Sequence, residues 1–214
     1  MVRRQSTPAE LADLVAARGV RYARVLAAVR AVPRAAFAPA EERDDAYEDV
    51  PLNIGHGQVT SQPSLVATMV EALALAGEER VLEVGTGLGW QTALLAALTR
   101  EVWSIERFSE LADAARESLA AEGVENAHVV VGDGSEGLPE HAPFEAIVVT
   151  AAHSAVPPPL AEQLTLGGRL VQPIGTGGEE EVVLFERERD GRVRRCTLVA
   201  ARFGRLYGRH GFAE

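Results

Sequence analysis

The chain has 214 residues, of which 47% are hydrophobic and 24% charged, and this composition predicts one soluble globular unit with a substantial core. Its formal net charge of −10 disfavours nucleic acid as a partner, because so acidic a surface repels phosphate backbones. A single cysteine, scattered histidines and the lack of any apolar run of roughly 20 residues argue against disulfides, metal sites and membrane segments, so we expect a cytoplasmic protein without a metal.

The first part of the chain predicts two short helices and an irregular arm. Thr7, Pro8 and Glu10 have the types and spacing of a capped helix start with a capping box, and a second helical stretch follows. Residues 35–54 lack periodicity and carry prolines and a run of acids, so we interpret them as an arm on the main domain. We therefore expect an N-terminal helical appendage and substrate-side arm over residues 1–60.

From Ser61 to the end, strands and helices alternate. This alternation predicts an α/β fold with a doubly wound, mostly parallel sheet over residues 61–214. The last two strands are joined through Asp190-Gly191 and predict an antiparallel hairpin at one edge, with the arginines around it on a solvated face. The expected helices span 63–74, 90–100 and 108–123, and the expected strands span 80–84, 101–106, 127–133, 144–152, 169–175, 180–188 and 195–203.

The segment VLEVGTGLGW ends the first of these strands and opens a helix. Gly85, Gly87 and Gly89 allow a tight turn and a close approach of the backbone to a ligand. The dinucleotide fingerprint requires a small residue where this chain has Trp90, and Glu83 would repel a pyrophosphate. The ammonium group of a methionine moiety would instead be attracted to that acid, which favours S-adenosylmethionine over a nicotinamide cofactor.

Two further turns strengthen this interpretation. Glu106 ends the next strand, where a doubly wound fold places the carboxylate that binds a ribose diol. Asp133 and Gly134 follow the third strand and are suited to an adenine edge. Each feature alone could be an ordinary turn or a surface acid, so a nicotinamide oxidoreductase and a binding module without activity remain alternatives.

The chain resembles the protein-L-isoaspartate O-methyltransferase family over nearly its whole length. The resemblance rests on VLAAVRAVPRAAF, AYEDVPLNIGHGQ, TSQP, VLEVGTGLGWQTALLA, VWSIER, GDGSEGLPEHAPFEAIVVTAA, VPPPLAEQLTLGGRLVQPIG and LYGRHGF. It implies a Rossmann-like class I methyltransferase fold that uses S-adenosyl-L-methionine and releases S-adenosyl-L-homocysteine. It also implies methylation of the free carboxylate of L-isoaspartyl residues in damaged proteins or peptides, which initiates repair through a succinimide. We expect a monomer.

The resemblance also assigns roles to individual positions. Ser61 would contact the substrate carboxylate as the catalytic residue. The other substrate-side positions would be Gln58, Val59, Thr60 and Thr150. The cofactor-binding positions would be Glu83, Gly85, Thr86, Gly87, Gly89, Glu106, Arg107, Asp133 and Gly134.

The chain departs from the family at its Gln-Thr-Ile-Ser signature, which here reads Gln58-Val59-Thr60-Ser61. Neighbouring side chains of an extended segment point to opposite sides, so Thr60 cannot simply replace the hydroxyl missing at Val59. The C-terminal segment around Gly204 also differs. These changes leave an O-methyltransferase acting on another carboxylate as the alternative function.

Three other positions allow two interpretations. His56 is either a proton shuttle or a loop histidine hydrogen-bonded to backbone, and Tyr47 and Asp49 either shape the pocket or anchor the arm. We expect Trp103 to lie in the core and Ser61 to cap the helix that begins at Pro63.

Overall fold

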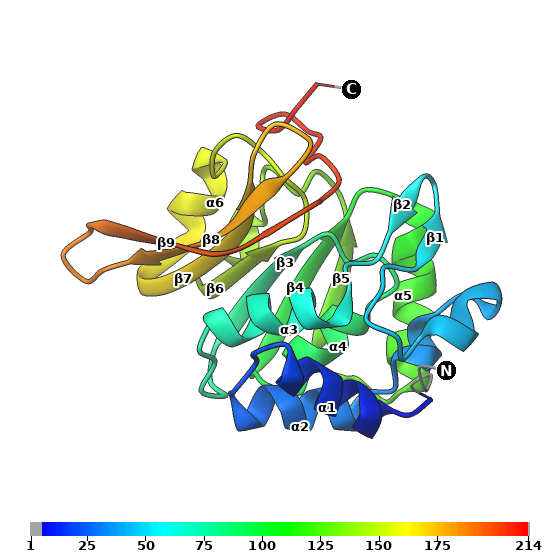
Figure 1. The fold of residues 1–214 in the computed structure, drawn as a ribbon. Helices are drawn as coiled ribbons and strands as arrows, with labels where there is room; N and C mark the ends of the chain where they lie inside the picture. The colour runs from blue at the N-terminus through cyan, green and yellow to red at the C-terminus, as the bar shows by residue number, and fades with distance from the viewer. Residues whose placement is uncertain (1–5, 214) are drawn as a thin grey trace.

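Seven strands form the central sheet in the order β5-β4-β3-β6-β7-β8-β9 (Figure 1). The computed structural model describes residues 6–213. The first five strands of that order are parallel to their neighbours, and β8 and β9 add an antiparallel hairpin, which confirms the predicted fold. The strands are β3 (Arg80–Val84), β4 (Glu101–Glu106), β5 (Ala127–Val131), β6 (Phe144–Val149), β7 (Leu164–Ile174), β8 (Glu180–Arg187) and β9 (Val193–Ala201).

Helices cover both faces of the sheet. Neighbouring residues of β3 face opposite helix layers. Val81 packs with α3 and α4 on one face of the sheet, and Leu82 packs with Leu160 of α6 on the other. The first two helices contact α3 rather than the sheet and belong to the same core (Figure 1). The helices are α1 (Pro8–Ala17), α2 (Ala23–Ala31), α3 (Pro63–Ala72), α4 (Trp90–Ala96), α5 (Ser109–Ala121) and α6 (Pro158–Gln163), with 3-10 turns at Arg34–Phe37, Ala40–Asp45 and Pro139–His141.

The start of α1 follows the sequence prediction closely. Thr7 is the N-cap, and its hydroxyl accepts a hydrogen bond from the Glu10 N–H at 3.2 Å. The Glu10 carboxylate accepts from the N–H of Ser6 at 2.9 Å, one residue before the position that a standard capping box uses.

Helix α4 ends at Ala96, four residues earlier than predicted. The side chain of Asn126 explains this end, because its Nδ2 donates to the carbonyls of Ala96, Thr99 and Arg100 at 3.0–3.3 Å. These carbonyls are satisfied from outside the helix, so the chain can turn into β4 without leaving buried acceptors unpaired.

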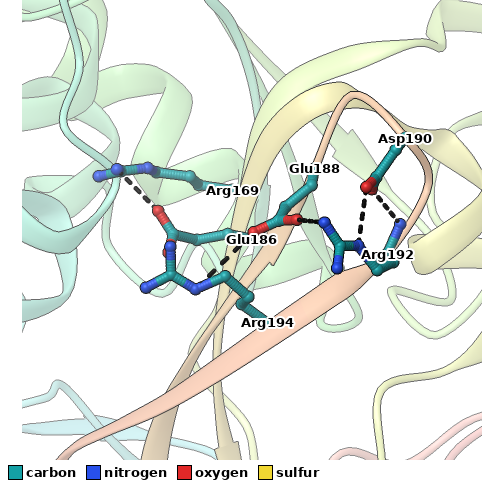
Figure 2. Close-up of polar contacts among 6 residues, drawn as sticks. All are labelled: Arg169, Glu186, Glu188, Asp190, Arg192 and Arg194. Carbon is teal, nitrogen blue, oxygen red and sulfur yellow. Dashed lines mark hydrogen bonds and ion pairs between the residues drawn. The ribbon is translucent and has the colours of Figure 1, made fainter.

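The β8–β9 hairpin carries a row of alternating charges (Figure 2). Glu186 lies in register between Arg169 and Arg194, and its carboxylate is 2.8 Å from the Arg169 guanidinium. Beyond it, Arg192 contacts Glu188 and Asp190 at the turn (Figure 2). Exposed pairs of this kind stabilise a fold only weakly, but they favour one strand register. The arginines of this hairpin therefore lie on a solvated face, as predicted.

The prediction that Trp103 lies in the core is confirmed only in part, because the side chain packs against the core but is not fully buried. The side chain is half-buried on β4 and lies against the rings of His141 and His128, with centroid distances of 3.4 and 4.5 Å. Two surface histidines therefore cover a tryptophan that was expected in the core.

Within residues 6–213 the protein has neither a membrane-spanning helix nor a cluster of metal-ligating side chains. No helix in this range has the length and apolar character needed to cross a bilayer. The same range contains no cluster of three or more His, Cys, Asp or Glu side chains suited to a metal.

Candidate active site

A cavity opens at the carboxyl ends of β3, β4 and β6, the edge where an open parallel sheet binds its ligands. Four segments that are distant in sequence supply most of its wall: 57–61, 84–91, 105–108 and 204–207. Gly134, Thr150 and Arg34 also line it, together with apolar residues of the arm and the neighbouring helices. Ser61 and the glycine loop therefore line one cavity.

The glycine loop is held against the end of β6. Gly85 has a φ of +96° and donates its N–H to the carbonyl of Ile105 at 2.8 Å. The Thr150 hydroxyl donates to the carbonyls of Val84 and Gly85, at 3.0 and 3.1 Å. Thr150 thus lines the cavity, as expected for a substrate-side residue, but its hydroxyl hydrogen is used to brace the loop.

Glu83 lies beneath the glycine loop and is fully buried. Its carboxylate accepts from Gln91 Nε2 at 2.9 Å, from the Thr92 hydroxyl at 2.5 Å and from the Ser104 hydroxyl at 2.6 Å. Burial raises the pKa of Glu83 to about 7, although these hydrogen bonds act in the opposite direction. Glu83 does not line the cavity, so its contribution to a cofactor site is to brace the loop that does.

Glu106 does line the cavity, at the end of β4. Its Oε2 accepts from the Gly87 N–H at 2.9 Å, and its Oε1 accepts from the Phe108 N–H at 3.1 Å. Each carboxylate oxygen keeps a second lone pair with which it can bind a ligand hydroxyl. Arg107 lies over the rings of Phe108 and Tyr207, at 5.0 and 5.2 Å, and forms part of the same wall.

Asp133 is placed differently from Gly134. The Asp133 carboxylate accepts from the Ser135 N–H and hydroxyl and from the Arg209 N–H, at 2.7–2.9 Å. Partial burial acts to raise the pKa of Asp133, but these hydrogen bonds outweigh it and the pKa is lowered. Gly134 lines the cavity and Asp133 does not, so Asp133 ties the C-terminal segment to the cavity wall.

The side chains of the substrate-side loop, residues 57–61, differ in their contacts. Val59 lines the cavity with 62% of its surface exposed, and Gln58 donates its side-chain N–H to the His56 carbonyl. Ser61 lines the cavity, and no group within the described part of the chain hydrogen-bonds to its hydroxyl. Thr60 also lines the cavity, but its hydroxyl accepts from Leu52 N–H and from a buried arginine, Arg34.

Arg34 and Gln91 are two polar cavity residues that sequence reasoning missed. Arg34 has only 1% of its surface exposed. The one sequence signal was its place in an apolar stretch, VPRAAF, where a charge needs buried partners. Those partners lie more than ten residues away, so they could not be named from the sequence.

The expected cap of α3 by Ser61 was wrong. Asp49 supplies the cap instead: its carboxylate accepts from the N–H of Ser64 and from the Ser64 hydroxyl, at 2.8 Å each. Asp49 and the half-buried Tyr47 thus anchor the arm. His56 stacks on Phe108 at 4.8 Å, a contact that neither sequence interpretation included.

The cavity fits an S-adenosylmethionine molecule in its donor and acceptor groups. Gln91 lines it, and its buried Oε1 accepts no hydrogen bond from residues 6–213. A buried acceptor without a donor is suited to an ammonium group, and the Glu106 carboxylate is suited to a ribose diol. A side chain at Gly85 would collide with Thr150, so glycine is what allows the loop to lie this close to the end of β6.

The chain is similar in sequence to proteins of one known family. The family model described as "Protein-L-isoaspartate(D-aspartate) O-methyltransferase (PCMT)" matches residues 6–211. A protein-L-isoaspartate O-methyltransferase from Methanoculleus marisnigri is 49% identical over 92% of this chain and 90% of its own length. One from Myxococcus xanthus is 48% identical over 92% and 94%.

Solved structures agree with these sequence matches. A protein-L-isoaspartate O-methyltransferase superposes with a TM-score of 0.83 at 28% identity, covering 96% of this chain and 67% of that one. A putative enzyme of the same name from Plasmodium falciparum, in complex with S-adenosyl-L-homocysteine, gives a TM-score of 0.82 at 21% identity over 95% and 99% of the two chains, which supports the fold.

Proposed function

The chain belongs to the protein-L-isoaspartate(D-aspartate) O-methyltransferase family, and from this premise we propose that it methylates L-isoaspartyl residues of damaged proteins. The methyl group comes from S-adenosyl-L-methionine and is transferred to the free carboxylate of the isoaspartyl residue. The observation that carries the proposal is the single cavity in which the glycine loop and Glu106 face the loop that bears Ser61.

When bound, S-adenosyl-L-methionine supplies an electrophilic methyl group on a sulfonium. The attacking carboxylate is already ionised at neutral pH, so the protein needs no strong general base. Its task is to hold the carboxylate on line with the methyl carbon in a cavity that excludes water. We assign this to the Ser61 hydroxyl, which can donate one hydrogen bond to a carboxylate oxygen.

The remaining residues would hold the cofactor. Glu106 accepts hydrogen bonds from the ribose hydroxyls, and Gly85, Thr86, Gly87 and Gly89 form the wall along its methionine part. We assign Gly134 to the adenine edge, with Asp133 holding the C-terminal segment against the same wall. Glu83 acts through the loop above it, and Arg107 closes the wall beside Tyr207.

The product ester explains how methylation can lead to repair. A methyl ester loses its alkoxy group far more readily than a carboxylate loses oxide. The neighbouring backbone nitrogen attacks the ester carbonyl, methanol leaves, and a succinimide forms. Water then opens the succinimide at either carbonyl, so that part of the product is an ordinary aspartyl linkage.

We further propose that the protein acts as one unit and as a monomer in the cytoplasm, without nucleic acid or a membrane as partner. Residues 1–60 carry the arm and the substrate-side loop, and residues 61–214 carry the cofactor cavity. Light scattering of the purified protein tests the monomer.

One labelling experiment tests the function. The protein is incubated with S-adenosyl-L-methionine labelled in its methyl group and with two peptides that differ only in isoaspartate or aspartate at one position. We expect label in the isoaspartyl peptide only. Equal labelling of both would indicate a general carboxyl methyltransferase, and labelling of neither would overturn the proposal.

Protection from heating tests the cofactor separately. A ligand that binds only the native state raises the unfolding temperature. We expect S-adenosyl-L-homocysteine to raise it and NAD to leave it unchanged. The opposite result would favour a nicotinamide enzyme.

A further inference from the structure

Arg34 joins the arm to the substrate-side loop. Its Nη1 donates to the carbonyls of Ala46 and Glu48, both at 3.2 Å. Its Nη2 donates to the carbonyl of Val50 at 3.1 Å and to the hydroxyl oxygen of Thr60 at 2.8 Å. One planar guanidinium therefore connects the arm to the substrate-side loop through buried or partly buried hydrogen bonds.

Thr60 is fixed from two directions. Its hydroxyl accepts from Arg34 and also from the N–H of Leu52, at 3.0 Å. Its own N–H donates to the Leu52 carbonyl at 2.8 Å. Arg34 Nη2 also lies 3.4 Å from the carbonyl oxygen of Ser61. The backbone on both sides of the Thr60–Ser61 peptide bond is thereby held, and the position of the Ser61 hydroxyl follows from it.

The same guanidinium also contacts the cofactor side of the cavity. Its Cζ lies 5.3 Å from the centre of the Trp90 ring, a cation–π distance. Trp90 follows the glycine loop directly, and its Nε1 donates to the Val32 carbonyl at 3.3 Å. Arg34 thus contacts Trp90, which follows the glycine loop, and Thr60, which precedes Ser61.

Arginine suits this place for two reasons. Its fork of donors can serve several carbonyls and a hydroxyl at once, which the single ammonium of lysine cannot do. Burial lowers the pKa of Arg34 to about 10, with the nearby charge of Asp49 acting against that change, so the guanidinium stays charged at neutral pH.

We propose that Arg34 and Thr60 are positioning residues that hold the Ser61 hydroxyl where it can orient the substrate carboxylate toward the transferred methyl group. The proposal rests on the proposed function. It also explains what the hydroxyl at Thr60 does in the altered signature Gln58-Val59-Thr60-Ser61. The hydroxyl at position 60 faces the buried arginine, while the Val59 side chain is exposed, so a hydroxyl at position 60 anchors the loop instead of contacting substrate.

The central variant is Thr60→Val, which keeps the shape and removes the acceptor. We expect kcat for the isoaspartyl peptide to fall about tenfold, because two buried donors lose their partner and the loop shifts. The dissociation constant of S-adenosyl-L-homocysteine should stay within about twofold. Thr60→Ser, which keeps the hydroxyl, should restore most of the lost kcat.

Thr99→Val is the matched control. Thr99 is buried and, like Thr60, uses its hydroxyl in hydrogen bonding, here to the Leu95 carbonyl at 2.8 Å, but it lies outside the cavity. We expect lower thermal stability with kcat unchanged. Arg34→Lys and Arg24→Lys form a second matched pair, because Arg24 also binds two backbone carbonyls, those of Leu75 and Leu98, away from the cavity.

A double-mutant cycle separates positioning from general stability. If Thr60 acts through Ser61, Thr60→Val should cost less than about twofold in kcat once Ser61 is alanine. Full additivity of the two changes would overturn the proposal. So would a Thr60→Val protein whose kcat stays within twofold of the parent.

Hydrogen exchange of the backbone amides at 58–62 provides a readout that needs no substrate. Thr60→Val and Arg34→Lys should speed this exchange about tenfold, and Thr60→Ser should not. Unchanged exchange in both variants would overturn the anchor. A parent protein that labels neither peptide would overturn the proposed function and the catalytic consequence with it, while the exchange result would still decide whether Arg34 and Thr60 hold the loop.

Discussion

The Gly85 backbone and the Thr150 hydroxyl are in direct contact, and a Cβ on Gly85 would overlap the hydroxyl oxygen. Gly85 also has a φ of +96°, which other residues adopt only with strain. We therefore expect Gly85→Ala to weaken S-adenosyl-L-homocysteine binding at least about tenfold, measured by calorimetry, because the loop must move off β6.

Gly191→Ala is the control for this change. Gly191 has a φ of +84° in the β8–β9 turn, and no atom of the described residues lies within 4 Å of a Cβ placed there. It shares the backbone strain but not the collision. If both variants lost affinity equally, the contact with Thr150 would not be the cause.

The buried carboxyl of Glu83 predicts a specific dependence of stability on pH. Its pKa is raised from 4.5 to about 7 in the folded protein, so the folded state binds a proton that the unfolded state has released between these values. Stability from this group is therefore present at low pH and is lost as pH rises towards 7. The shift corresponds to about 3 kcal/mol.

Glu83→Gln removes this titration and keeps the shape. We measure the free energy of unfolding in urea at pH 5 and at pH 8. The change between the two pH values should be about 3 kcal/mol smaller in the variant than in the parent. Glu145→Gln, which changes a half-buried carboxylate on β6 that accepts from Arg80 N–H, is the comparison. Parallel pH curves for the parent and Glu83→Gln would show that Glu83 does not titrate in this range.

Glu106 is predicted to bind the ribose hydroxyls of the cofactor. Glu106→Ala should raise the dissociation constant of S-adenosyl-L-homocysteine about 10- to 100-fold, since a charged acceptor for two hydroxyls is removed. The variant also loses the hydrogen bond that Glu106 accepts from the Gly87 N–H. A loss of affinity alone would therefore not show that Glu106 binds the ribose. A 2′-deoxy analogue resolves this: it should bind the parent less tightly than the natural ligand, and the variant should not distinguish the two.

Much of the fold was predictable because its signals are local. Each strand was a short apolar run, and each turn carried glycine or a polar residue at the sheet edge. The exceptions have long-range causes. Helix α4 ends early because Asn126, 30 residues after Ala96, takes its last carbonyls. Trp103 packs against the core but stays half-buried, and the rings of His128 and His141, which come from later segments of the chain, lie against it.

The site was predictable at the level of segments and less so at the level of side chains. The glycine loop, Glu106 and Ser61 do meet at one cavity. The sequence could not reveal that Glu83 lies beneath the loop, or that Asp133 binds the C-terminal segment. Both depend on which donors surround a carboxylate after folding, and those donors come from other parts of the chain.

Asp133 is predicted to hold residues 206–212 in place. Its carboxylate accepts from the Arg209 N–H at 2.7 Å, and its lowered pKa means that this stability is present near neutral pH and is lost as pH falls. Asp133→Ala should speed hydrogen exchange at 206–212 about tenfold. Glu140→Ala, on the exposed turn at Pro139–His141, should leave this exchange unchanged. If exchange at 206–212 were as slow in Asp133→Ala as in the parent, other contacts would hold the segment.

The variant Ser61→Ala tests catalysis separately from cofactor binding. Its hydroxyl is the one side-chain donor that we assign to the substrate carboxylate, and it takes no part in the cofactor wall. Ser61→Ala should therefore lower kcat for the isoaspartyl peptide about 10- to 100-fold and leave the affinity for S-adenosyl-L-homocysteine within about twofold. Steady-state kinetics and calorimetry on the same preparation measure both. If kcat were unchanged, the carboxylate would be oriented by backbone N–H groups of the loop, and Ser61 would have no catalytic role.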